Sequence, residues 1–210
     1  MPGKKRKNNL SALSQLMTLY AGGPGSGCHG ENCGRPKTEL QSMLENIPKL
    51  WGENNLWAKL AKYGHAGNIE PFTKTELDRL NALKKAAGYG KKDCEVGFCF
   101  MNAQRLAMAA MHDKNVQLVE GLVTVHGVPI DHSWVEYNGK VFDPTLANYK
   151  GDKEADYSKV GRRSLSGSMP EYHGVVVPKE EIAKFWLSKK TYSPLSHEHG
   201  NESLQRKIWK

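Results

Sequence analysis

One histidine and one carboxylate in this chain are spaced so that a hairpin would bring them together. Asn138 and Gly139 stand between two alternating apolar runs, which is the strongest short-range signal for a two-residue β-turn. If these two residues form the turn, Trp134 lies opposite Asp143 and shares a face with His132. His132 and Asp143 are then diagonal neighbours about 7 to 8 Å apart along the backbone, a gap that two side chains can close. A carboxylate that orients an imidazole prepares a general base, although a half-buried hairpin with an incidental polar pair explains the same pattern.

A cysteine upstream of this hairpin could supply a nucleophile. Gly97 stands where the chain would turn into a helix, and good helix formers follow from Cys99 onward. Apolar residues then recur at helical spacing, at Phe100, Ala103, Leu106, Ala107, Ala110 and Met111. Cys99 would lie in the first helical turn, where unpaired amides and the helix dipole favour the thiolate that attacks carbonyl carbon. The sequence therefore predicts a triad in which Cys99 attacks, His132 moves the proton and Asp143 orients the imidazole.

Four short motifs surround these residues in order: Cys-Phe-Met-Asn-Ala at 99–103, Val-Glu-Gly at 119–121, His-Ser-Trp-Val at 132–135 and Phe-Asp-Pro-Thr at 142–145. Together they resemble the transglutaminase-like branch of the papain-like cysteine-enzyme superfamily. The resemblance covers roughly residues 93–145, about a quarter of the chain, with a weaker likeness at 172–195. It implies an α+β fold in which the helix of the nucleophile packs on an antiparallel sheet, with the His and Asp on adjacent strands.

The chain departs from the resemblance at the oxyanion hole. Six residues before the nucleophile, where papain-like enzymes often carry a glutamine, this chain has Asp93. The backbone amide of Cys99 is a candidate donor, and Asn102, one helical turn on, or Lys92 could supply a second. Trp134, on the face expected for His132, is a candidate for contact with a substrate.

The four cysteines also allow a different site. Cys28 and Cys33 are separated by four residues, and so are Cys94 and Cys99. Four thiolates in two pairs could bind zinc, with His29 as a substitute ligand. This alternative excludes the triad, because Cys99 cannot be both a ligand of a closed zinc site and a free nucleophile. The triad itself needs no metal and no cofactor.

Composition favours a soluble chain with a basic extension. The chain has 210 residues, 39% of them hydrophobic, and no apolar run approaches the roughly 18 to 20 residues that span a bilayer. The first seven residues are basic but no apolar stretch follows them as in a secretory signal, which favours a cytoplasmic location. Of the net charge of +8, residues 1–37 hold six Lys or Arg and one Glu. This basic arm could contact nucleic acid weakly, although most such runs are solvated.

Residues 1–37 are predicted to be a flexible extension. Apolar residues from Leu10 to Tyr20 have helical spacing, and a Gly-rich segment follows at 22–36. Its Gly25-x-Gly27-x-x-Gly30 pattern fits a dinucleotide fingerprint only formally, because no buried strand precedes it. The segment resembles a short tag of proteins encoded by tailed bacteriophages, which implies a location in the bacterial host cytoplasm or the virion.

The remaining chain is divided into an enzyme domain at 38–195, with a helical scaffold at 38–90 and a catalytic core at 91–195, and a polar C-terminal tail at 196–210. In the scaffold, Thr38 with Gln41 and Thr75 with Asp78 are typical of capping boxes, and Pro48 is expected to end the first helix. Downstream we predict a loop at 146–169, a buried strand at 172–177 and a helix at 180–189.

The expected function is cysteine-dependent acyl transfer to water, as in a peptidase or amidase that acts on a protein or peptide of phage or host. An amine acceptor would give a transglutaminase-type crosslinker, and the resemblance does not separate the two. The alternative from another class is a virion or interaction protein that keeps the fold without activity.

Overall fold

The computed structural model describes residues 39–51, 55–89, 97–125, 128–146, 170–197 and 201–209, all within one compact unit, Lys37–Lys210. The helices of these residues are α2 (Glu39–Trp51), α3 (Leu56–Tyr63), α4 (Lys74–Ala86), α5 (Cys99–Ala109), α6 (Lys179–Lys189) and α7 (Glu202–Ile208). The strands are β1 (His65–Ala66), β2 (Val116–Val125), β3 (Val128–Tyr137), β4 (Lys140–Phe142) and β5 (Tyr172–Val177). None of the described helices combines the length and apolarity that crossing a membrane requires.

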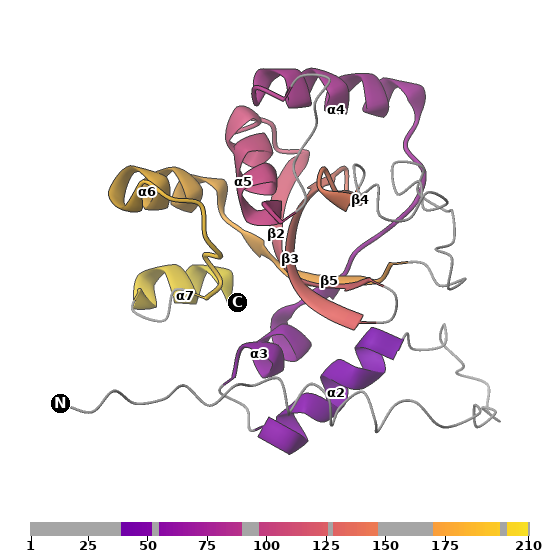
Figure 1. Cartoon of the computed structure of the whole chain (residues 1–210), viewed down its shortest axis with the longest axis vertical. Helices are drawn as coiled ribbons and strands as arrows, with labels where there is room; N and C mark the ends of the chain where they lie inside the picture. Colours follow the sequence, from indigo (N-terminus) through magenta and orange to yellow (C-terminus); the bar gives the residue numbers. More distant parts are fainter. Residues whose placement is uncertain are drawn as a thin grey trace. The chain divides into compact units, whose positions relative to one another are not determined.

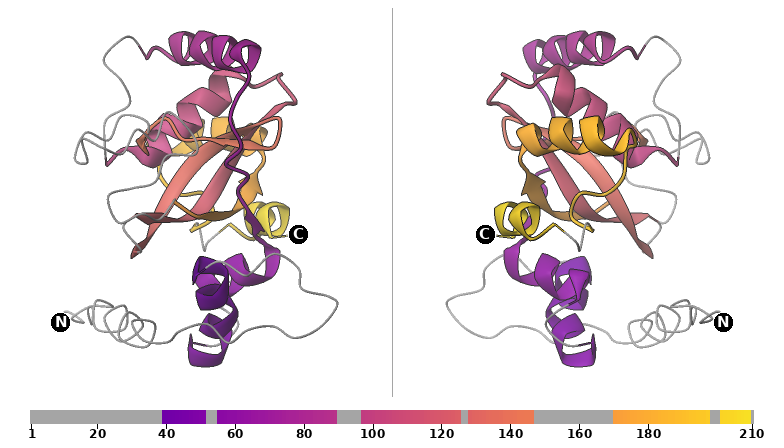
Figure 2. Two further views of the ribbon diagram at one scale, coloured as in Figure 1. Left: turned by 90° about the vertical axis from the view of Figure 1, so that its right-hand side faces the viewer. Right: turned by 90° about the vertical axis from the view of Figure 1, so that its left-hand side faces the viewer.

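The strands form one sheet in the order β1-β5-β2-β3-β4, and every neighbouring pair is antiparallel. In Figure 1, α5 lies across β2 and β3, with α6 beside it. Figure 2 shows α4 at one end of the sheet and α3 at the other. Helices and an antiparallel sheet confirm the α+β class that the sequence predicts.

The hairpin of β3 and β4 has the predicted register. Val135 pairs with Phe142 and Tyr137 with Lys140, so that Asn138 and Gly139 are the two loop residues. Their φ angles are +53° and +74°, the left-handed conformation that a type I′ turn requires at both positions. The hairpin prediction is therefore confirmed, and Asp143 follows β4 directly.

One face of the sheet carries a buried apolar cluster that surrounds Trp134. Register places Trp134 opposite Val119 on β2 and places Val176 of β5 on the other side of Val119. The cluster consists of Val119, Val123, Trp134, Val141, Leu146 and Tyr172. Gly121 of β2 pairs with Gly174 of β5. A Cβ on Gly121 would lie only 2.2 Å from the His173 carbonyl oxygen, so the close approach of the two strands requires glycine at this position.

The helix α4 is anchored to the hairpin. Its capping box is formed by Thr73 and Glu76 rather than by Thr75 and Asp78, so the predicted start was two residues late. Glu76 also accepts hydrogen bonds from the Asn138 side chain at 3.1 Å and from Lys140 Nζ at 3.0 Å. The first turn of α4 therefore holds the tip of the hairpin.

Two predicted boundaries differ from the structure. The prediction that Pro48 ends the first helix is wrong, because α2 continues to Trp51. A proline inside a helix removes one backbone hydrogen bond, and the helix can continue beyond it. The segment 196–210, predicted as a polar tail, contains α7, whose Leu204 and Ile208 are buried. These two apolar residues lie four apart on one helix face, which accounts for the packing of an otherwise polar segment.

Candidate active site

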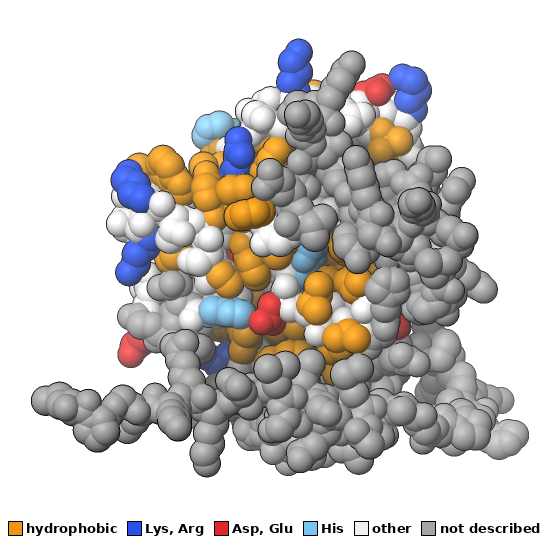
Figure 3. Space-filling view, viewed as in Figure 1, with side chains coloured by type: hydrophobic (Ala, Val, Ile, Leu, Met, Phe, Trp, Pro, Cys, Tyr) orange, Lys and Arg blue, Asp and Glu red, His pale blue; other side chains and the backbone are white. Residues whose placement is uncertain are grey.

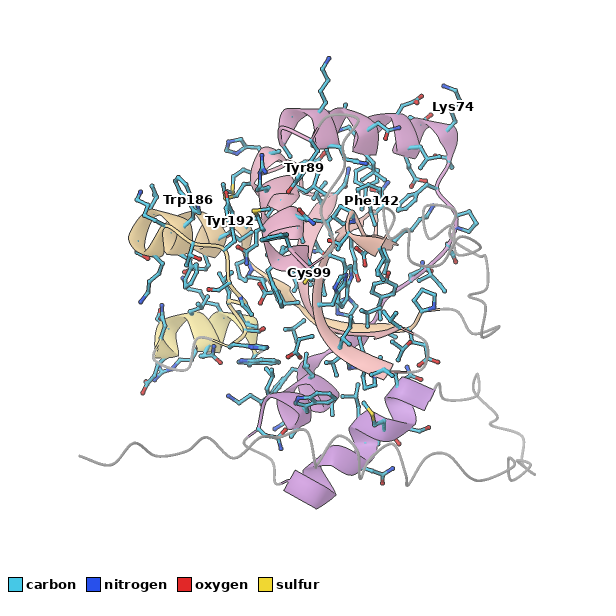
Figure 4. The ribbon with its side chains drawn as sticks, in the orientation of Figure 1. Lys74, Tyr89, Cys99, Phe142, Trp186 and Tyr192 are labelled. Carbon is cyan, nitrogen blue, oxygen red and sulfur yellow. The ribbon has the colours of Figure 1, made fainter. Side chains whose placement is uncertain are left out.

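The Cys99 side chain is carried by the first residue of α5. Gly97 turns the chain into this helix with a φ of +92°, a conformation that side chains other than glycine rarely adopt. Phe98 is the N-cap, and Cys99 is a free, partly exposed cysteine. Figure 4 shows Cys99 where α5 meets the strands, and Figure 3, in the same orientation, shows a hollow bordered by apolar side chains there. The predicted location at a helix start is confirmed.

The imidazole of His132 lies between a carboxylate and the thiol. Its Nε2 is 2.6 Å from Asp143 Oδ2, and both side chains are buried. The Cys99 side chain lies close enough to the same ring to contribute to the raised pKa of His132. Because Asp143 occupies Nε2, the nitrogen left for Cys99 is Nδ1. The structure thus brings Cys99, His132 and Asp143 together in the order that the sequence predicts.

Both oxygens of the Asp143 carboxylate are held by donors. Oδ1 accepts the backbone amides of Thr145 and Leu146, each at 2.9 Å. Oδ2 accepts the Tyr172 hydroxyl at 3.0 Å in addition to the His132 ring. A carboxylate with this many donors is fixed in orientation and favoured in its charged form.

The protonation states of the pair favour a charged imidazole. Burial lowers the pKa of His132, but the charge and hydrogen bond of Asp143, with a smaller contribution from the Cys99 side chain, raise it well above its ordinary 6.5. Burial likewise raises the pKa of Asp143, but the charge and hydrogen bond of His132 and the two backbone amides lower it below 3.8. Both directions describe an imidazolium bound to a carboxylate.

Trp134 fixes the plane of the His132 ring. The two rings are stacked, with centroids 6.4 Å apart and an angle of 18° between their planes. Tyr172 packs edge-on against Trp134, with the ring centroids 5.1 Å apart. The Trp134 Nε1 donates to Glu136 Oε1 at 3.5 Å, and His65 Nε2 lies 3.0 Å from the same oxygen. Trp134 is completely buried, which favours a role in orienting His132 over the predicted contact with substrate.

Of the two side chains predicted as oxyanion donors, the structure describes only Asn102. Asn102 is completely buried, and its side chain donates to Thr145 Oγ1 at 3.0 Å and accepts from the Tyr89 hydroxyl at 3.2 Å. These bonds connect α5 to the chain after β4. They occupy the Asn102 side chain inside the protein, which argues against its predicted role as an oxyanion donor. Lys92 lies outside the described residues, as do Cys28, Cys33 and Cys94 of the zinc alternative. Within the described part of the chain, no three His, Cys, Asp or Glu side chains are grouped to hold a metal.

Sequence reasoning missed Tyr172, the one residue that reaches the site from β5. Twenty-nine positions separate it from Asp143, and it is placed by the register of β5 against β2, in which Tyr172 pairs with Val123. No local spacing encodes that pairing. The strand itself was predicted, and its antiparallel pairing with β2 is the signal that leads to Tyr172.

Comparison of the chain with protein-family models, with curated proteins and with solved structures finds no match.

Proposed function

We propose that the protein is a cysteine-dependent acyl-transfer enzyme with Cys99 as nucleophile, His132 as acid and base and Asp143 as the group that orients the imidazole. The observation that carries this proposal is the continuous chain of side chains from Cys99 through His132 to Asp143, with the cysteine at a helix start. The fold suits the papain-like and transglutaminase-like architecture, since the helix of the nucleophile packs on an antiparallel sheet.

In the proposed reaction the Cys99 thiolate attacks the carbonyl carbon of an amide or ester. The backbone amide of Cys99, at the positive end of α5, is the proposed donor to the oxyanion that forms. The His132 imidazolium then gives its Nδ1 proton to the leaving amine or alcohol, and a thioester remains on Cys99. Asp143 keeps the Nε2 proton in place throughout, which holds the ring in the tautomer that can accept a proton at Nδ1.

The neutral imidazole then removes a proton from the second substrate. Water as acceptor releases an acid, whereas an amine gives a new amide, so the acceptor decides between a peptidase or amidase and a crosslinker. We propose hydrolysis of a protein or peptide as the first activity to test. The tag-like segment at 22–36 suggests phage and host proteins as the substrates to try.

The nucleophile can be tested without knowing the substrate. Labelling by iodoacetamide near pH 7, followed for each cysteine by mass spectrometry, is expected to modify Cys99 roughly tenfold or more faster than Cys94. His132→Ala is expected to remove this difference, because the imidazolium that favours the thiolate is lost. His112→Ala is the matched control, since His112 is exposed beyond the far end of α5. Equal labelling of the two cysteines in the wild-type protein would falsify the proposal.

A further inference from the structure

The aromatic ring that stacks on His132 is itself bound by a buried carboxylate. Glu136 follows Trp134 by two positions on β3, so both side chains lie on the same face of the sheet as His132. Its Oε1 accepts the Trp134 Nε1 proton at 3.5 Å. The indole is completely buried, and its plane lies within 18° of the plane of the His132 ring. The Glu136 carboxylate therefore restrains the indole that supports the imidazole.

A second histidine binds the same carboxylate from the edge of the sheet. Nε2 of His65, on β1, lies 3.0 Å from Glu136 Oε1. Because an ionised carboxylate only accepts hydrogen bonds, this nitrogen is the donor. The hydrogen bond raises the pKa of His65, burial lowers it, and the charge of Glu136 raises it further. The His65 side chain is 43% exposed and that of Glu136 only 5%, so His65 supplies the partner that a buried carboxylate requires.

Two glycines leave room for the indole between the two histidines. His65 pairs with Gly174 of β5, which in turn pairs with Gly121 of β2. On its other side, Gly121 pairs with His132. Paired residues of neighbouring strands share a face, so this row of the sheet has an imidazole at each end and no side chain between them. A Cβ on Gly174 would lie 2.7 Å from Trp134 Cη2, which shows that the indole fills the space above this glycine.

We propose that Glu136 and His65 are positioning residues for the His132 imidazole, on which they act through Trp134. This inference rests on the proposed function, because it concerns the base of the Cys99 site. It also gives the segment 38–90, which supplies none of the three proposed catalytic residues, a part in the site through His65.

Two substitutions of similar length separate the contact from the volume of the side chain. Glu136→Gln keeps an oxygen that can accept from Trp134 and His65, whereas Glu136→Met fills similar space without an acceptor. His65 remains half-exposed to solvent, so Glu136→Met leaves no buried charge unpaired. His65→Gln and His65→Leu form a second pair, because glutamine keeps a donor and leucine does not.

Labelling of Cys99 by iodoacetamide near pH 7 is expected to slow about three- to tenfold in Glu136→Met, since a displacement of 1 Å at a reacting group can cost about 100-fold. Glu136→Gln is expected to label close to the wild-type rate. His65→Leu is expected to be slower than His65→Gln by a smaller factor, because Trp134 still bonds to Glu136 in both variants.

The NMR signals of the His132 ring protons report the stacking directly, because the ring current of the indole shifts them. In Glu136→Met these signals are expected to move toward their unstacked positions, and in Glu136→Gln they are expected to stay. Glu181→Met is the control for loss of a buried carboxylate, since the partners of Glu181 are Lys184 on α6 and Lys207 on α7. This control is expected to lose stability without changing the labelling or the His132 signals.

Equal labelling rates and equal His132 signals in Glu136→Gln and Glu136→Met would overturn the inference. If Glu136→Met does not fold, His65→Leu and His65→Gln make the same comparison at a half-exposed position, and equality between them would overturn it too.

The same data separate this inference from the proposed function. If Cys99 of the wild type labels no faster than Cys94 and His132→Ala changes nothing, the proposed function fails, and the His132 signals alone decide whether Glu136 holds the ring. If Cys99 is activated by His132 but neither pair of variants differs, only the positioning role fails.

Discussion

The Tyr172 hydroxyl donates to Asp143 Oδ2 at 3.0 Å, the same oxygen that lies 2.6 Å from His132 Nε2. Two donors therefore share one carboxylate oxygen. The phenol neutralises part of the charge that would otherwise act on the imidazole alone, and so it limits how strongly His132 holds its proton.

Tyr172→Phe is expected to raise the pKa of His132 by up to about one unit. A hydrogen bond to a charged group is worth about 1.5 to 3 kcal/mol, and about 1.4 kcal/mol corresponds to one unit. The phenyl ring keeps its contact with Trp134, so a purely structural role predicts no shift. The measurement is an NMR titration of the His132 ring, with Tyr192→Phe as control because Tyr192 contacts Trp186 elsewhere. A pKa that stays or falls contradicts this role.

Asn102→Ala is expected to lower stability and leave catalysis largely intact. The substitution removes the side-chain donor to the buried Thr145 hydroxyl and one of the two Asn102 oxygens that accept from the Tyr89 hydroxyl, at a cost of about 1 to 3 kcal/mol in the free energy of unfolding. Loss of an oxyanion donor would instead slow turnover about 100- to 1,000-fold. Denaturant unfolding and hydrolysis of an activated ester measure the two quantities. A folded variant that is slowed 100-fold would restore Asn102 as an oxyanion donor.

Gly174→Ala is expected to disturb the site through Trp134. The added Cβ would lie 2.7 Å from Trp134 Cη2 and 2.7 Å from the Glu120 carbonyl oxygen. Overpacking of this kind costs about 1 to 3 kcal/mol of stability, and the displaced indole no longer holds the His132 ring. Rapid labelling of Cys99 is therefore expected to decline.

Gly139→Ala is the matched control for this prediction. No atom lies within 4 Å of the added Cβ, but the φ of +74° makes alanine strained by about 1 to 2 kcal/mol. This variant is expected to lose comparable stability while it keeps the rapid labelling of Cys99. If both variants lose the labelling equally, the effect of Gly174→Ala comes from stability alone.

The His132 and Asp143 pair is expected to make the free energy of unfolding depend on pH. The fold raises the pKa of His132 from 6.5 to about 10. The stabilisation that the charged imidazole contributes is therefore complete below pH 6.5 and is lost as the pH rises toward 10. The fold lowers the pKa of Asp143 from 3.8, so its contribution is present above 3.8 and is lost as the pH falls below that value.

The difference in unfolding free energy between the wild type and His132→Gln is therefore expected to be largest between about pH 4 and 6.5 and to shrink at higher pH. Denaturant unfolding at a series of pH values measures it, with His112→Gln as the control. A difference that grows above pH 6.5 would show that the imidazole is bound in its neutral form.

The parts of the site that were predicted from the sequence are those that local spacing encodes. Asn138 and Gly139 set the hairpin register, and that register alone brings His132 and Asp143 to one face. The helix start at Cys99 follows from Gly97 and the apolar periodicity after it.

The parts that were missed depend on contacts between distant segments. Thr73 with Glu76 and Thr75 with Asp78 satisfy the same capping pattern, and Glu76 has the additional contacts to Asn138 and Lys140 in the hairpin. Tyr172 reaches Asp143 only through the pairing of β5 with β2. Such pairings are settled by packing over the whole sheet, and a local pattern does not contain them.

The position of β5 in the sheet has a consequence for synthesis on the ribosome. Cys99, His132 and Asp143 are all made before β5, but β5 supplies the Tyr172 hydroxyl and joins β1 to β2. A nascent chain that ends before Tyr172 thus carries every proposed catalytic residue without the strand that completes their surroundings. The surroundings of Cys99, His132 and Asp143 are therefore completed by a strand that is synthesised after all three of these residues.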